Sequence, residues 1–443
     1  MKRSKGEWIR YRDQGIAVLL FIGIFLIPVH LRTLLFQDIP GYYRGINFPG
    51  MLAVLICCTA FRKWKKAEWL CAVLWMLMAV PVIVSEPDAG KRTLSICQNL
   101  LPLFLVLYRM DEENRQKAVR FALLLFDIFM ILFFLLGIEE FFNGRRFLIF
   151  IRDFLQTRGY DPAELTRYIA DGRVASIWGH PLTTALLFNL FFSVNLAYGY
   201  YYVKNWQRYV LPLFTVSFLG VLMASSKTGF AVCILLLLAA FWKQKKYYVL
   251  AVPVILILYF SGALNGLIRR FETTSLTTGR MENLLRYFEM GTNRIMWFTG
   301  NGSNALYSSN PDFYVRAGFE FPEIMFAYDF GIVFSIVTMG GLFLYCACRF
   351  LARRQWLAFS CYVLLFAQIS TYNGYSLRNQ DICLLFNGYT MMMLNMASGR
   401  QKNTDIKEED AAETRKRRNP DNKKEQGRER AWLQKKGRLF LST

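Results

Sequence analysis

Residues 121–138, which read FALLLFDIFMILFFLLGI, form an apolar run in which Asp127 is the one charged side chain. A helix of about 20 such residues is long enough to cross the roughly 30 Å hydrocarbon core of a bilayer. The rest of the chain is similar, since 54% of its 443 residues are hydrophobic, 16% are aromatic and the mean hydropathy is +0.25. A soluble chain of this length cannot cover so much apolar surface, so a soluble enzyme is excluded.

Comparable apolar runs recur along the sequence and predict an all-α protein, a polytopic membrane bundle of about 12 transmembrane helices. The first run has no small-residue cleavage site after it, so we expect an uncleaved anchor and both termini on the same side of the membrane. The expected spans are residues 15–36, 46–61, 67–84, 93–108, 121–138, 177–198, 209–224, 228–242, 247–264, 323–346, 356–372 and 382–397.

Basic residues predict the orientation of this bundle. Seven segments at alternate connections and at both termini hold 35 of the 53 Lys and Arg residues. Because basic residues are retained in the cytoplasm, we expect a multi-pass protein of the cell membrane with both termini cytoplasmic. This topology explains the net charge of +21 without a nucleic-acid partner. A transmembrane domain over residues 1–397 would precede a disordered, charged cytoplasmic tail over residues 398–443, which associates with membrane lipids.

The basic residues outside those segments differ in type, because 16 of them are Arg and only 2, Lys91 and Lys227, are Lys. A guanidinium group binds phosphate oxygens through two parallel hydrogen bonds and stays charged, whereas an ammonium group is a strongly hydrated point charge. The bias therefore predicts that the external face binds phosphate groups.

Metal and disulfide chemistry have little support in the sequence. All nine cysteines lie in apolar runs, and no CxxC pair with a flanking histidine is present. We therefore expect no disulfide framework, no metal site and no cofactor. Glu86 and Asp88 form the one external acid pair of the kind that binds a divalent cation, and they remain the alternative.

Two expected external loops, residues 139–176 and 265–322, are long and carry their own helix signals. In the first loop, residues 145–155 predict an amphipathic helix in the lipid headgroup layer. Its apolar face consists of Phe147, Ile151, Phe154 and Leu155. A second helix is predicted by an N-cap, a proline at the first position, a capping-box acid and a glycine stop, which are Asp161, Pro162, Glu164 and Gly172.

The second loop predicts a helix that Thr278 caps and Gly291 ends. Its apolar stripe consists of Met281, Leu284, Leu285 and Phe288. Residues 300–302, which read GNG, predict a tight turn, and such turns sometimes present backbone amides to an anion.

Four short motifs carry a family resemblance. They are RVASIWGHP over residues 173–181, SKTG over residues 226–229, GRME over residues 279–282 followed by Trp297 and GNG, and a Gly-Ile pair at residues 331–332. Together they resemble the O-antigen ligase and polymerase superfamily of bacterial membrane glycosyltransferases, over less than half of the chain. Where ligases of that family carry His-Asn ahead of the Gly-Ile pair, this sequence has Glu320, which favours a polymerase.

The resemblance implies an inverting, metal-independent enzyme that polymerises undecaprenyl-diphosphate-linked oligosaccharide repeat units of a surface polysaccharide on the outer face of the membrane. Other polysaccharide-export proteins are further candidate partners. Arg173 and Arg280 are the first candidates for binding the diphosphate, extended by Lys227 and Arg294. Glu320 is the first candidate for the catalytic base.

Several alternatives remain open for these residues and for the function. Glu323 is the second candidate base, although a position in the first turn of a helix also suits a structural acid. His180 is a candidate catalytic residue or an ordinary interfacial residue. Each arginine would equally serve as a headgroup anchor. An O-antigen-type ligase differs only in its acceptor, whereas a transporter or lipid-linked oligosaccharide flippase would perform no catalysis.

Overall fold

Every regular element among the described residues is a helix, as the apolar runs predict. The computed structural model describes residues 2–36, 47–59, 66–85, 90, 93, 96, 100–159, 162–242, 259–260, 262, 264–273, 279–291, 294–302, 319–371 and 380–397. In chain order the helices are α1 (Lys2–Phe21), the π-helical η1 (Ile22–Leu26), α2 (Val29–Phe36), α3 (Phe48–Thr59), α4 (Lys66–Val84), the 3-10 helix η2 (Leu101–Leu107), α6 (Arg115–Phe142), α7 (Arg146–Thr157), α8 (Ala163–Ala170), the 3-10 helix η3 (Ser176–Trp178), α9 (Pro181–Tyr202), α10 (Trp206–Ala224), α11 (Lys227–Phe241), α13 (Asn265–Thr273), α14 (Arg280–Glu289), α17 (Pro322–Phe330), α18 (Ile332–Ser335), the π-helical η4 (Ile336–Gly340), α19 (Gly341–Ala352), α20 (Trp356–Ser370) and a helix over residues 380–397.

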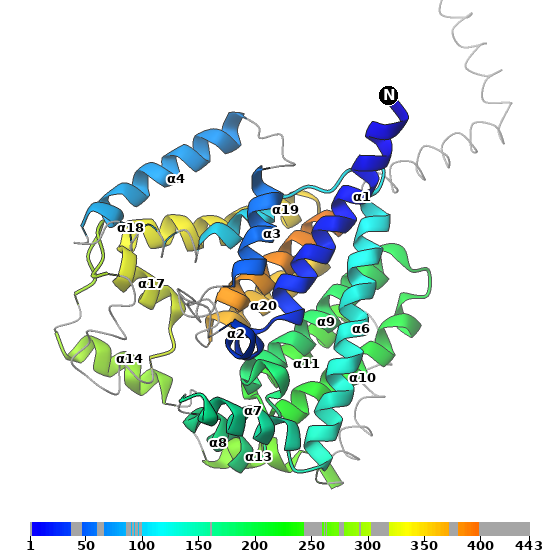
Figure 1. Ribbon diagram of the computed structural model, residues 1–443, viewed down its shortest axis with the longest axis vertical. Helices are drawn as coiled ribbons and strands as arrows, with labels where there is room; N and C mark the ends of the chain where they lie inside the picture. Colours follow the sequence, from blue (N-terminus) through cyan, green and yellow to red (C-terminus); the bar gives the residue numbers. More distant parts are fainter. Residues whose placement is uncertain are drawn as a thin grey trace, which may run out of the picture. The chain divides into compact units, whose positions relative to one another are not determined.

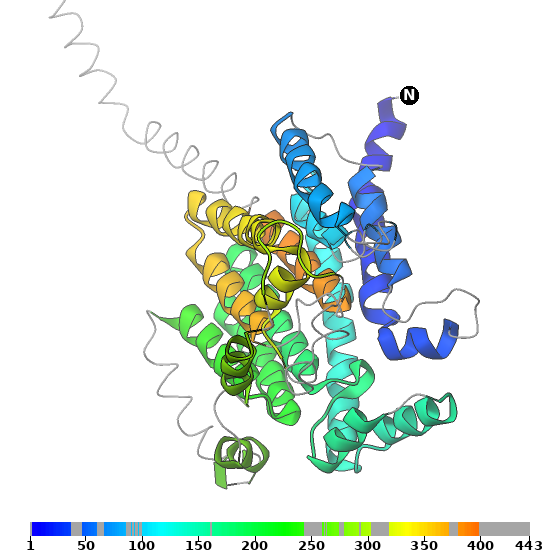
Figure 2. The same cartoon turned by 90° about the vertical axis from the view of Figure 1, so that its left-hand side faces the viewer.

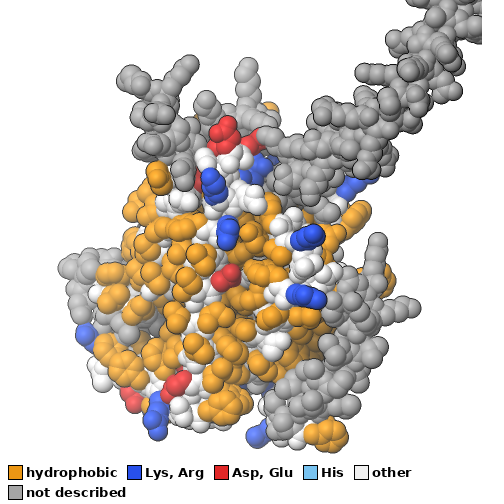
Figure 3. Space-filling model, turned by 90° about the vertical axis from the view of Figure 1, so that its right-hand side faces the viewer, with side chains coloured by type: hydrophobic (Ala, Val, Ile, Leu, Met, Phe, Trp, Pro, Cys, Tyr) orange, Lys and Arg blue, Asp and Glu red, His pale blue; other side chains and the backbone are white. Residues whose placement is uncertain are grey.

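Four helical segments are long and apolar enough to cross a membrane. They are α6, α9, α10 and the continuous stretch Ile332–Ala352. Helix α6 exposes Leu124, Ile128, Leu132 and Leu135 along one side. Figure 3 shows hydrophobic side chains covering most of one face, with the basic side chains mainly toward its upper and lower parts. Such a face suits contact with lipid tails.

Helix α9 lies at the centre of the bundle. Nearly all of its residues are buried, and it packs against α6, α10, α11 and α20 (Figure 1). Close contacts depend on glycine, because a Cβ atom at Gly220 of α10 would lie 2.4 Å from the ring of Phe188, and one at Gly229 of α11 would lie 2.7 Å from Ala185. Both neighbours belong to α9, so α10 and α11 each pack closely against it.

Several polar side chains inside the bundle form hydrogen bonds between helices. Asn189 of α9 donates hydrogen bonds to the carbonyl of Gly229 and to the side chain of Gln368, both at 2.9 Å. Asn195 donates to Asp127 at 2.7 Å, so Asp127 takes part in the packing of α6 against α9. An unpaired polar group in this interior would cost several kcal/mol, so these bonds fix the register between helices.

Two of the expected spans are interrupted. The first is split at Ile27, between η1 and α2, just before Pro28, whose nitrogen cannot donate a helical hydrogen bond. The span expected over residues 323–346 is split at Gly331, whose φ of 93° favours glycine and ends α17. The membrane-length helix accordingly begins at Ile332, and Glu323 precedes it.

The contact between α9 and α10 generates a stability prediction. Gly220→Ala should lower the free energy of unfolding by about 1–3 kcal/mol, because the new methyl group overlaps the ring of Phe188. The measurement is the midpoint of thermal unfolding in detergent. Gly341→Ala is the matched control, since nothing lies within 4 Å of a Cβ atom there. Equal midpoints for the two variants would contradict the close packing described.

Candidate functional site

Helices α7 and α8 form a small apolar core of their own. Leu148, Ile151 and Leu155 of α7 pack with Leu165 and Tyr168 of α8. The amphipathic helix predicted for this segment is therefore present, except that Leu148 joins the core, whereas Phe154 packs with Phe150.

The boundaries of α8 are close to those predicted. Pro162 is the N-cap residue rather than the first helical residue, and Gly172 follows the C-cap Asp171 with a φ of 71°. Asp161, the expected N-cap, lies outside the described residues. The chain thus turns at Gly172, and Arg173 lies directly after this turn, next to the helix bundle.

Arg173 is held against the C-terminal end of α10. The backbone N–H of Val174 donates to the carbonyl of Met223 at 3.1 Å, and the Arg173 Nε donates to the carbonyl of Ala224 at 3.3 Å. The Arg173 side chain is consequently buried, with 5% of the residue exposed. Its Nη2 atom has no hydrogen-bond partner among the described residues.

A second arginine reaches the same helix end. Arg270 of α13 donates from Nη1 to the carbonyl of Ser225 at 2.6 Å, next to the carbonyl that Arg173 binds. Helix α13 is positioned by apolar contacts with α10 and α11, through Phe218, Leu222, Cys233, Leu264 and Leu267. Carbonyl groups at a helix C-terminus lack partners within the helix and attract cations, so both guanidinium groups are stabilised there.

Lys227 completes this group, which we call the cationic cluster (Arg173, Lys227 and Arg270). Ser225 adopts a left-handed conformation with φ of 49°, and the Ser226 side chain caps α11 by accepting a bond from the Gly229 N–H at 3.1 Å. Lys227 is therefore the first residue of α11. It is 9% exposed, and its Nζ lies 5.0 Å from the ring centroid of Phe271.

The cations of this cluster affect one another. Burial, and next the charge of Arg270, lower the pKa of Arg173 to about 10, while Tyr168 and Asp171 partly oppose the shift. Burial also lowers the pKa of Arg270, and Asp171 again opposes the shift. A lowered pKa means that the charged form is destabilised relative to water, so a bound anion would stabilise the cluster.

Tyr168 of α8 links the cationic cluster to the other candidates. The Arg173 guanidinium carbon lies 5.3 Å from the Tyr168 ring centroid, and the His180 ring meets the same ring edge-on at 5.5 Å between centroids. Burial raises the pKa of Tyr168 to about 12, helped by the charges of Glu164 and Glu320. The structure thus brings His180 and Glu320 into the surroundings of Arg173.

Glu320 forms an ion pair with Arg280 of α14. The Arg280 Nε and the Glu320 Oε2 are 2.5 Å apart, and 32% of the Glu320 side chain is exposed. An apolar cluster of Tyr287, Phe319, Met325 and Tyr328 holds the two segments together. The partly exposed carboxylate is therefore fixed in position and accessible.

The predicted apolar stripe of α14 is wrong in detail. Tyr287 is fully buried, whereas Met281, Leu285 and Phe288 are exposed by 45%, 55% and 59%. The reason is tertiary, because Phe319 and Tyr328 approach from the side of Tyr287. Gly279 is the N-cap residue of α14, and Thr278 lies outside the described residues.

Two further candidates belong to other segments. Arg294 is exposed, and its carbonyl accepts a hydrogen bond from the side chain of Asn301 at 3.0 Å. Glu323 occupies the first turn of α17 behind Pro322, as the sequence predicts. The GNG turn does not offer its amides to an anion, since the N–H groups of Asn301 and Gly302 donate to the carbonyls of Tyr328 and Asp329.

Sequence reasoning missed two residues of this site, Arg270 and Tyr168. Arg270 lies on α13 in the second long loop, and a search for further arginines on amphipathic helices of these loops would have identified it. Tyr168 has no comparable signal, because its role depends on contacts with residues that follow it.

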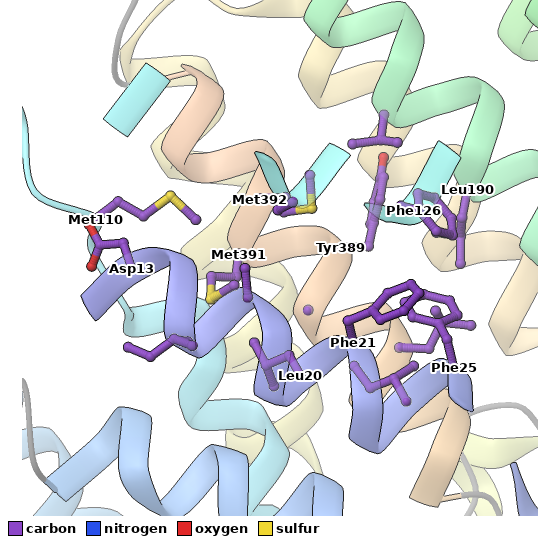
Figure 4. Close-up of a pocket in the computed structure, with 17 residues that line it drawn as sticks. Asp13, Leu20, Phe21, Phe25, Met110, Phe126, Leu190, Tyr389, Met391 and Met392 are labelled. Carbon is purple, nitrogen blue, oxygen red and sulfur yellow. The ribbon is translucent and has the colours of Figure 1, made fainter. Parts of the chain in front are cut away.

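Within the described part of the chain, neither a metal-binding group nor the apolar pocket beside α1 offers a competing site. The part of the chain that the structure describes contains no group of three or more His, Cys, Asp or Glu side chains arranged to hold a metal ion, and Glu86 and Asp88 lie outside that part. An apolar pocket lies between α1, α6, α9 and the helix over residues 380–397 (Figure 4). Asp13, the one charged residue among its described lining, already accepts hydrogen bonds from Tyr108 and Arg12.

Comparison with known proteins adds no relative to this description. The chain matches no protein-family model, no curated protein and no solved structure.

The cationic cluster predicts how anion binding depends on pH. Because the pKa of Arg173 in the free protein is about 10, the affinity for sulfate should be level near neutral pH and fall as the pH rises through that value. Sulfate is the probe because it does not titrate in this range, and calorimetric titration in detergent measures its affinity.

Two variants check the assignment to Arg173. In Arg173→Lys the sulfate affinity should begin to fall at a lower pH than in the wild type, since an ammonium group has a lower intrinsic pKa than a guanidinium group. Lys227→Met should bind sulfate more weakly at every pH, and its sulfate affinity should still fall at high pH as in the wild type. Identical pH profiles for wild type and Arg173→Lys would exclude Arg173 from the anion site.

Proposed function

We propose that this protein is a membrane glycosyltransferase that polymerises undecaprenyl-diphosphate-linked oligosaccharide repeat units of a surface polysaccharide. The single observation that carries the proposal is the meeting of Arg173, Lys227 and Arg270 at the end of α10, with Glu320 nearby. Three buried or half-buried cations suit a diphosphate, and a partly exposed carboxylate suits an attacking hydroxyl group.

The proposed topology puts this site outside the membrane. In a bundle of about twelve spans, the loops over residues 139–176 and 265–322 would be external, and both termini and the tail over residues 398–443 would be cytoplasmic. Helices α7, α8 and α13 come from these two loops and lie at the same end, away from the N-terminus (Figures 1 and 2). Their shared position is what a single external active site requires.

The chemistry needs no metal ion. The acceptor hydroxyl oxygen attacks the anomeric carbon from the face opposite the diphosphate, the bond from that carbon to the diphosphate oxygen breaks, and its electron pair leaves with undecaprenyl diphosphate. The hydroxyl proton passes to Glu320. Fixed guanidinium groups stabilise the charge that develops on the leaving diphosphate, and burial strengthens that effect.

The ion pair between Arg280 and Glu320 has a role in this scheme. A diphosphate that binds Arg280 competes with Glu320 for it, so donor binding would release the carboxylate toward the acceptor. Glu323 remains the second candidate base. In this scheme His180 supports the site indirectly, through its ring contact with Tyr168.

The alternatives predict different products. A ligase would use the same donor site and pass the glycan to another acceptor. A flippase or transporter is favoured by one observation, the buried ion pair between Arg32 and Asp381 at 2.9 Å beside the break at Ile27. Charged pairs beside broken helices often line transport paths.

Elongation of a lipid-linked substrate tests the proposal. Purified protein supplied with undecaprenyl-diphosphate oligosaccharide should produce lengthened lipid-linked chains, separated by gel electrophoresis. Arg173→Lys and Arg270→Lys should reduce the rate about 100-fold or more, as loss of a transition-state donor does. Glu320→Gln should reduce it by a similar factor, as loss of a general base does.

Arg158→Gln is the matched control, because Arg158 is an exposed arginine of the same external loop. Wild-type rates in Arg173→Lys or Glu320→Gln would remove that residue from the mechanism. If wild-type protein lengthens no chain but moves the lipid across a vesicle bilayer, the flippase alternative is correct.

A chelator separates the proposed mechanism from the metal-dependent alternative. Elongation should continue unchanged in the presence of EDTA, because arginine side chains neutralise the diphosphate. Loss of product that Mg²⁺ or Mn²⁺ restores would instead indicate an acid-bound cation, with Glu86 and Asp88 as the first residues to replace.

A further inference from the structure

A second set of arginines lies at the opposite end of α6 from the cationic cluster. Helix α6 runs for 28 residues from Arg115, and Glu140, near its other end, accepts a bond from the Ser176 N–H. A helix of that length spans about 42 Å. The set consists of Arg109 after η2, Arg115 at the start of α6, and Arg349 and Arg353 at the end of α19, and we call it the arginine quartet.

Tyr345 joins two members of the quartet. Arg109 donates from Nη2 to the Tyr345 hydroxyl oxygen at 2.7 Å, and the Arg349 guanidinium carbon lies 5.8 Å from the centroid of the Tyr345 ring. Arg109 is fixed further by donating from Nη1 to the carbonyls of Val106 and Tyr108. The side chains are therefore held in place by the fold and not simply extended into solvent.

Like charges are kept close together here. Burial, and then the charges of Arg349 and Arg115, lower the pKa of Arg353. The Nε atoms of Arg115 and Arg349 are buried without a hydrogen-bond partner among the described residues. Arg115 faces Glu112 at 3.9 Å, but 67% of that acidic side chain is exposed, so the pair is weak. A bound anion would reduce the repulsion.

The position of the quartet indicates where that anion comes from. Arg115 is the first residue of one membrane-length helix, and Arg353 directly follows the last residue of another, Ile332–Ala352. Trp356, three residues later, is 64% exposed, as is common for tryptophan at the level of lipid headgroups. The quartet therefore lies at the depth where phospholipid phosphates lie.

Retention of basic residues in the cytoplasm explains the presence of arginines at this end, but not their arrangement. Retention in the cytoplasm requires only an arginine near the end of a helix, such as the exposed Arg120 of α6. Two members of the quartet, Arg109 and Arg349, instead meet at Tyr345 from different segments, and the Nε atoms of Arg115 and Arg349 are buried. Such convergence is typical of a binding site for an anionic headgroup.

We propose that the arginine quartet binds the phosphate group of an anionic phospholipid. The site is distinct from the cationic cluster and does not depend on the glycosyltransferase reaction. Two of its guanidinium groups would bind the phosphate oxygens through paired hydrogen bonds, while the acyl chains contact the apolar sides of α6 and α19.

Lipid retention tests the proposal. The full-length protein is placed in nanodiscs of phosphatidylcholine with increasing phosphatidylglycerol, released into mild detergent, and examined by native mass spectrometry for bound phospholipid. Phosphatidylglycerol should be retained in preference to phosphatidylcholine. Arg349→Gln/Arg353→Gln should weaken retention about thirtyfold, from roughly fivefold for each arginine near the membrane surface. Arg120→Gln, on the same helix as Arg115, should leave retention unchanged.

Two further measurements test the proposal independently of whether the glutamine variant folds. Arg349→Lys/Arg353→Lys preserves the charge but not the paired hydrogen bonds, so it should lose several-fold in retention even if the glutamine variant does not fold. Inorganic phosphate at millimolar concentration should not displace the lipid. The proposal would be overturned if Arg120→Gln lost as much lipid as the double variants, or if phosphatidylcholine were retained as well as phosphatidylglycerol. Full retention in both double variants would also overturn it. Displacement of the lipid by inorganic phosphate would overturn it by indicating that the site binds a soluble anion.

Discussion

The carbonyl groups at the C-terminal end of α10 lack partners within the helix, and the architecture of the candidate site follows from this constraint. Inside an apolar bundle such groups must be bonded by something other than water. Arg173 and Arg270 bond the carbonyls of Ala224 and Ser225, and each comes from a different long loop. Two segments that are distant in the sequence therefore contact the same helix end. The hydrogen bonds that satisfy its carbonyl groups also bring two positive charges close together.

That concentration of charge is costly to the folded protein. Ser176, three residues after Arg173, and Ser225, two residues before Lys227, have positive φ angles of 50° and 49°. Non-glycine residues in this conformation are strained, and buried cations near one another repel. Destabilising features of this kind persist where a ligand can offset them. The Arg280 and Glu320 pair is less costly, since each side chain partly neutralises the charge of the other.

The sequence allowed much of the local structure to be predicted, because local structure depends on neighbours along the chain. The helical character of the chain, the amphipathic α7 and the stop at Gly172 are as the sequence predicts. Contacts between distant segments were not predictable in the same way. The buried face of α14 is set by Phe319 and Tyr328, and the break at Gly331 reflects backbone contact with Trp297 and Phe298. Among the site residues, Arg173, Lys227 and Glu320 were identified from motifs, whereas Arg270 lies outside those motifs.

The turn between α10 and α11 contains only Ser225 and Ser226, and its brevity ties the length of the chain to the geometry of the site. Each residue of an α-helix advances the side-chain direction by about 100°. One inserted or deleted residue at this turn would therefore swing Lys227 away from Arg173 and Arg270 while leaving the composition of both helices nearly the same. Insertions and deletions in descendants of this sequence should accordingly accumulate in other connections and spare these two serines, even where the serines themselves are replaced.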